Sequence, residues 1–76
     1  PLWLLPVPLP LASTEAHRYY RGSVKVGSSA ERIESGWWDG RDACRDYYAA
    51  LSSSGERLWI YRDRRSLDWY LHGLFG

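Results

Sequence analysis

The residues able to act as nucleophiles or to transfer protons are few and scattered. The single cysteine is Cys44, and the two histidines, His17 and His72, lie far apart in the sequence. Hydrolysis through a covalent intermediate needs a cysteine or serine beside a histidine, and no spacing here places such a pair together. Cys44 is expected to be a small buried residue instead. The sequence therefore predicts no catalytic residue and a protein that is not an enzyme.

Three aspartates come closest to a metal site: Asp39, Asp42 and Asp46. They lack the spacing of a calcium loop, and each stands beside an arginine or a turn glycine, which favours turn capping and surface ion pairs. One cysteine and two histidines are too few soft ligands for a structural zinc ion. The chain also contains neither a phosphate loop nor a dinucleotide fingerprint. We therefore expect neither a metal site nor a cofactor.

Aromatic residues are the most unusual feature of the sequence. They make up 16% of the 76 residues and occur as adjacent pairs at positions 19–20, 37–38 and 47–48. Neighbouring side chains on a strand face opposite sides, so one member of each pair can fill a core while the other is exposed. Exposed tryptophan, tyrosine and arginine are typical of protein interface hot spots. The predicted partner-binding residues are Trp37, Trp38, Arg41, Asp42, Tyr47 and Tyr48.

The same residue types can also bind single-stranded DNA, because aromatic rings stack on bases and arginines contact phosphates. The residues predicted to make this alternative contact are Tyr61, Arg62, Arg64 and Arg65. Ten basic residues are balanced by nine acidic ones, which is not the charge of a general nucleic-acid binder. Core packing alone is the third interpretation of the aromatic residues. The residue types by themselves leave all three open.

The elements that must position these residues are expected to be β-strands. Tyrosine, tryptophan, isoleucine and leucine recur with a period near two in residues 45–51, 57–63 and 68–72, with turn residues in the gaps. This pattern predicts a three-stranded antiparallel meander, and further strands are expected near residues 23–26 and 32–38. Both faces of the meander carry apolar residues. We therefore predict an all-β fold, either a small twisted antiparallel sheet or a partly open barrel of about five strands.

Residues 1–16 are predicted to form an extended proline-rich arm, and residues 17–76 a small β domain. All four prolines lie in the uncharged segment 1–11, where they fix φ and remove helix donors, so it resembles neither a signal peptide nor a membrane helix. We expect the arm to pack on its own domain or on a longer parent protein. The first residue is a proline and there is no methionine, so the chain is expected to be a fragment. The single cysteine favours a cytosolic location.

Five short motifs form a specific combination along the chain: PLWLLP at residues 1–6, RIESGWWDG at 32–40, RDYY at 45–48, LWIYR at 58–62 and WYLHGLF at 69–75. The last four strongly resemble the C-terminal domain of ImuB proteins, which are catalytically inactive relatives of bacterial Y-family DNA polymerases. The first motif is similar to the segment that precedes this domain in the family. The resemblance covers residues 1–11 and 31–75.

The resemblance implies a role in SOS mutagenesis, the damage-inducible mutagenesis of bacteria. In that family ImuB is an adaptor for translesion synthesis that bridges the sliding clamp, the error-prone polymerase ImuC and the RecA-like protein ImuA. The expected function is a non-catalytic interaction module that docks ImuC, ImuA or RecA itself. It would act in the bacterial cytoplasm near the nucleoid, with DNA contacted indirectly and no membrane. A single-stranded DNA contact module and a structural cap of the parent protein are the alternatives.

Overall fold

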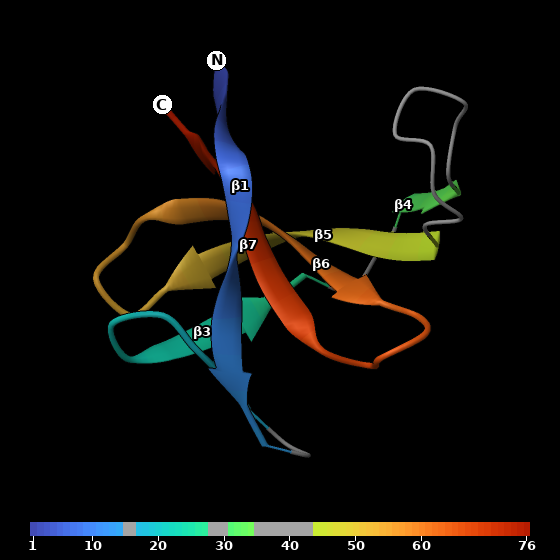
Figure 1. Ribbon diagram of the computed structural model, residues 1–76. Helices are drawn as coiled ribbons and strands as arrows, with labels where there is room; N and C mark the ends of the chain where they lie inside the picture. The colour runs from blue at the N-terminus through green and yellow to red at the C-terminus, as the bar shows by residue number, and fades with distance from the viewer. Residues whose placement is uncertain (15–16, 28–30, 35–43) are drawn as a thin grey trace.

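The computed structural model describes residues 1–14, 17–27, 31–34 and 44–76, and for residues 31–34 only the backbone. This part of the chain forms seven strands and no helix (Figure 1). The strands are β1 (Leu2–Ser13), β2 (Arg18–Tyr19), β3 (Ser23–Val26), β4 (Glu31–Glu34), β5 (Cys44–Ser52), β6 (Arg57–Asp63) and β7 (Trp69–Phe75). Within the described residues, then, no helix is long and apolar enough to cross a membrane.

Six of the described strands close into an antiparallel ring. Their order is β3, β2, β1, β7, β6 and β5, and β5 pairs back onto β3. β5 is long enough for two partners on one edge: its first residues pair with β4, and residues 50–52 pair with β3. The predicted all-β antiparallel fold is confirmed. The ring has more strands than the five expected, because residues 2–13 form a strand of the sheet and residues 18–26 form two strands.

The predicted meander corresponds to β5, β6 and β7, and β7 continues three residues beyond the predicted end. Trp59 pairs with Gly73 and Ile60 with Leu71, so His72 is the extra residue of a β-bulge. A bulge changes which face the following side chains occupy. Because of it, Leu74 packs against the core although an unbroken alternation from Leu71 would turn it outward.

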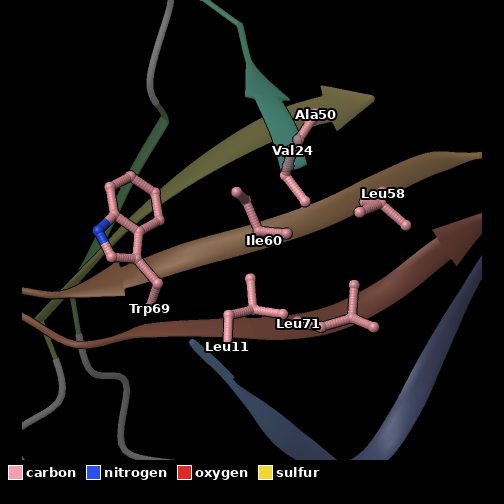
Figure 2. Close-up of a cluster of buried hydrophobic side chains, with 7 residues drawn as sticks. All are labelled: Leu11, Val24, Ala50, Leu58, Ile60, Trp69 and Leu71. Carbon is pink, nitrogen blue, oxygen red and sulfur yellow. The ribbon is translucent and has the colours of Figure 1, made fainter. Parts of the chain in front are cut away.

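The core lies inside the ring and follows the period of two. Leu58 and Ile60 are fully buried, and Leu71 is 1% exposed. Figure 2 shows these side chains converging from neighbouring strands. The buried cluster is Leu11, Val24, Ala50, Leu58, Ile60, Trp69 and Leu71.

β1 has a different repeat from the other strands. Its least exposed residues, Leu5, Pro8 and Leu11, are three positions apart, which is the repeat of a polyproline II helix. The proline-rich sequence favours that geometry, and the pairing of β1 with β7 accordingly shifts register between Leu4 and Leu9. β1 nonetheless stays beside β7, and the two chain ends lie close together (Figure 1).

Candidate functional site

A second aromatic cluster lies on the outer face of the meander, on the side of the sheet opposite the core. We call it the outer aromatic cluster. Tyr47 is at its centre: its ring centroid lies 5.0 Å from that of Trp59, stacked, and 5.1 Å from that of Tyr61, tilted. Tyr61 in turn stacks on Tyr70 at 5.1 Å. The members of the cluster are Tyr47, Trp59, Tyr61, Tyr70 and His72.

A chain of polar contacts runs through this cluster. Arg45 donates from Nη1 to the Tyr47 hydroxyl oxygen at 3.3 Å, and that oxygen lies 2.7 Å from Nδ1 of His72. An arginine can only donate, so Tyr47 accepts from Arg45, while the donor in the Tyr47–His72 bond depends on which ring nitrogen of His72 carries the proton. The arrangement holds three strands together and leaves Arg45 4.5 Å from the ring centre of Tyr61.

Burial and the Arg45 charge together make the stability of the fold depend on pH, through the titration of His72. Burial lowers the pKa of His72 below its ordinary value of 6.5, and Arg45 lowers it further. The unfolded chain therefore binds this proton more readily, so the free energy of unfolding should fall as the pH drops below about 6.5. The loss ends once the pH is below the pKa of folded His72. Urea unfolding at a series of pH values would measure it.

His72→Asn provides the control for this pH dependence, because the asparagine amide can hydrogen-bond the Tyr47 hydroxyl as donor or acceptor without titrating. Its unfolding free energy should lose the His72 contribution to the acid-side slope. In the unmodified chain, NMR of the His72 ring protons should give a midpoint below 6.5. A midpoint at or above that value would contradict a pKa lowered by burial and by Arg45.

Tyr61 provides a matching prediction at alkaline pH. Burial raises its pKa to about 12, against the opposing effect of Arg45. Its contribution to stability is therefore complete below pH 10 and is lost between about pH 10 and 12. Ultraviolet titration should show one tyrosine ionising near pH 12, and Tyr61→Phe should remove that step. Identical titration curves for the two proteins would contradict this burial.

The predicted partner-binding residues fall into three groups. Tyr47 faces outward but is only 4% exposed, because the outer aromatic cluster covers it. Tyr48 faces inward, with its ring 5.3 Å from that of Trp69. The other four lie outside the described residues: Trp37, Trp38, Arg41 and Asp42.

The residues predicted to contact DNA lie on different surfaces. The Tyr61 ring is 3% exposed and lies between Arg45 on β5 and Tyr70 on β7. Arg62 projects from the other face of β6 toward the ring of Trp69, 5.9 Å away. Arg64 and Arg65 are exposed in the β6–β7 turn. Of the residues predicted to contact DNA, Arg64 and Arg65 are thus the two that are exposed on one surface.

The residues weighed for catalysis and metal binding are dispersed. Cys44 lies 3.3 Å from Nη1 of Arg64, while His17 packs near Tyr19 and His72 bonds Tyr47. In the described part of the chain, no three histidine, cysteine or acidic side chains are placed to hold a metal ion.

The largest exposed apolar surface was not predicted as a binding site. Of the eight large apolar or aromatic side chains exposed in the described residues, five lie on β1, with Trp3 67% and Val7 72% exposed. The period of three imposed by the prolines was the available signal, because it turns two residues of every three outward. This apolar face of β1 consists of Leu2, Trp3, Leu4, Val7 and Leu9.

The backbone edge beside this face is unsuited to adding another strand. Among the described residues, β1 pairs with β2 only at Ala12 and Ser13, which leaves the earlier residues paired with β7 alone. The prolines at positions 6, 8 and 10 have no N–H group to donate to a new strand. The segment therefore offers side chains rather than backbone groups to a partner.

Comparison with known proteins finds two relatives, the ImuB proteins of Caulobacter vibrioides strains NA1000 and ATCC 19089. Each is 33% identical to this chain over 66 aligned residues, which cover 70% of the chain. The aligned region is only 14% of the length of each ImuB protein. The chain matches no family model, and no solved structure matches it either. The chain is therefore similar to a short part of ImuB, in agreement with the resemblance of its motifs.

Proposed function

We propose that this chain is a non-catalytic protein-interaction module of an ImuB-type adaptor in SOS mutagenesis. Its partner is the error-prone polymerase ImuC or the RecA-like protein ImuA, in the bacterial cytoplasm. The apolar face of β1 is the observation that carries the proposal, and the similarity to ImuB supports it. The parent protein is polymerase-like but inactive in this proposal, and the sliding clamp binds elsewhere on it.

Leaving the apolar face of β1 in water costs free energy that a binding partner would recover. Burying a large apolar side chain is worth about 1.5–3 kcal/mol, and β1 exposes five of them within residues 2–9. Tryptophan is among the residues that dominate interface energies, and Trp3 is 67% exposed. The prolines also hold the segment extended before binding, so little conformational entropy remains to be lost.

The test is to measure binding of purified ImuC, ImuA and RecA to the chain before and after the apolar face is made acidic. The double variant Trp3→Asp, Val7→Asp should lower the affinity for the partner by about tenfold or more. The matched control is Leu67→Asp, because Leu67 is also an exposed apolar residue, at 55%, but lies in the β6–β7 turn. The proposal fails if no partner binds the unmodified chain, or if both variants bind it equally well.

The tryptophans of residues 37–38 stay part of this proposal as predicted contacts. Trp38→Ala should also weaken the same partner while leaving the fold intact. If Trp38→Ala keeps both the fold and the affinity, Trp38 is not part of the interface, and the proposed role of β1 is unaffected.

The exposed pair Arg64 and Arg65 supports a second candidate, contact with single-stranded DNA. A site in which these two arginines neutralise two phosphates should give a log-log salt slope of about −1.4 on single strands. Docking through the apolar face of β1 should depend far less on salt. The burial of Tyr61 makes this candidate the weaker one, since that ring has no free face for a base.

A further inference from the structure

A second surface of the chain combines an apolar hollow with two basic residues. A hollow of about 610 Å³ opens where β3, β5 and the end of β7 meet, a size typical of ligand pockets. Ala49, Leu51 and Phe75 give it an apolar lining, and its two charged residues are Lys25 and Arg57. We call it the Phe75 hollow.

The strand register explains why there is a hollow at this place. Gly27 donates its N–H to the Ala49 carbonyl at 2.9 Å, and Ala49 pairs across β5 and β6 with Trp59. Two residues with little or no side chain therefore lie beside a large ring. Trp59 also meets the edge of Phe75, with ring centroids 6.0 Å apart. Small side chains flanked by large ones leave a depression in the sheet surface.

The same register places a cation on each side of one exposed leucine. Leu51 is 45% exposed, and it pairs with Lys25 on β3 and with Arg57 on β6. The two cations are thus two strand spacings apart, roughly 10 Å. The Arg57 guanidinium lies 5.5 Å from the ring centre of Phe75. Among the described residues neither cation has a carboxylate partner, and the lining of the hollow includes no acidic residue.

We propose that the Phe75 hollow binds an acidic peptide segment of a protein partner in the polyproline II conformation, in which two carboxylates three residues apart flank apolar side chains. Three residues of a polyproline II helix make one turn and rise about 9 Å, which brings both carboxylates to one face and is close to the separation of the cations. The apolar side chains between them fill the space above Ala49 and Leu51. Complementary charge selects the peptide, and apolar burial holds it.

The geometry favours a peptide over single-stranded nucleic acid. A base needs an open aromatic face, but Phe75 already has Arg57 over its ring and Trp59 at its edge. The hollow shares no lining residue with the apolar face of β1, although the two surfaces are neighbours at Leu2, which pairs with Phe75. This inference rests on the proposed function only for the identity of the partner.

The experiment uses the chain itself and a synthetic peptide whose centre reads aspartate, leucine, phenylalanine, aspartate. Its control replaces both aspartates with asparagine. NMR titration should shift the amide signals of Gly27, Ala49 and Leu51 with the acidic peptide, and the asparagine peptide should bind about tenfold more weakly. The difference should shrink as salt is added, because the carboxylates are exposed to solvent.

Charge reversal makes the test specific to the two cations. The double variant Lys25→Glu, Arg57→Glu should lose the acidic peptide and gain a peptide with lysines at both acidic positions. Arg65→Glu, another exposed arginine, is the matched control and should bind the acidic peptide as before. Far-ultraviolet circular dichroism on each variant checks that the fold is kept.

Three results would overturn the inference: equal binding of the acidic and asparagine peptides, no exchange of peptide preference on charge reversal, or a single-stranded oligonucleotide displacing the peptide from the hollow. Neither ImuC, ImuA nor RecA takes part in this experiment. Its failure is therefore distinct from failure of the proposed function, which depends on ImuC, ImuA or RecA binding at β1.

Discussion

Leu58→Ala is expected to lower the free energy of unfolding by about 2–5 kcal/mol. Leu58 is fully buried on β6, and it pairs with Ala50 on β5 and with Leu74 on β7. Both neighbouring strands are fixed in the ring, so the cavity left by the lost methyl groups can close only in part. Small domains are stable by only about 5–15 kcal/mol. Urea unfolding followed by tryptophan fluorescence should show a much lower midpoint.

The matched control is Leu51→Ala, which makes the same chemical change on the neighbouring strand. Leu51 is 45% exposed on the outer face, so its truncation should cost well under half as much. Equal losses for the two variants would contradict a core confined to the inside of the ring. Leu51 also lines the Phe75 hollow, so Leu51→Ala should bind the acidic peptide more weakly even though it loses less stability than Leu58→Ala.

The meander could be predicted from the sequence because its side chains follow the period of a strand. Leu58 and Ile60 alternate with Trp59, and this alone assigns one face to the core. β1 could not be placed in the sheet in the same way. Its prolines give a repeat of three, which indicates an extended segment but does not say which strand it joins. The pairing with β7 depends on long-range contacts that the pattern does not contain.

The aromatic pair at residues 47–48 predicted one inward and one outward tyrosine, and the structure has Tyr48 inside and Tyr47 outside. The burial of Tyr47 could not be predicted. It depends on His72, whose position follows from a bulge in β7, and on Trp59 from β6. The side chains that bury Tyr47 come from different strands, and they meet only in the correct strand register. The Phe75 hollow was missed for the same reason, since Gly27 and Ala49 are far apart in sequence.

Gly73→Ala is expected to detach the first residues of β1 from β7. A Cβ atom on Gly73 would lie 2.8 Å from the carbonyl oxygen of Trp3, too close for any real Cβ contact. That oxygen belongs to the backbone of the paired strand, so the strand itself must move. Overpacking of this kind costs about 1–3 kcal/mol. Residues 2–4 pair with β7, so the loss should appear there as faster hydrogen exchange of the Gly76 amide, which donates to the Pro1 carbonyl oxygen.

Gly55→Ala separates this steric effect from the general cost of replacing a glycine. A Cβ at Gly55 would meet nothing within 4 Å, but its φ of +89° makes alanine strained there. That strain should cost about 1 kcal/mol and leave the exchange of the Gly76 amide unchanged. Because Trp3 must move with the strand, Gly73→Ala should also lower the affinity for any partner that binds the apolar face of β1. Gly55→Ala should leave that affinity unchanged. Equal exchange rates in the two variants would mean that β1 does not depend on the close approach at Gly73.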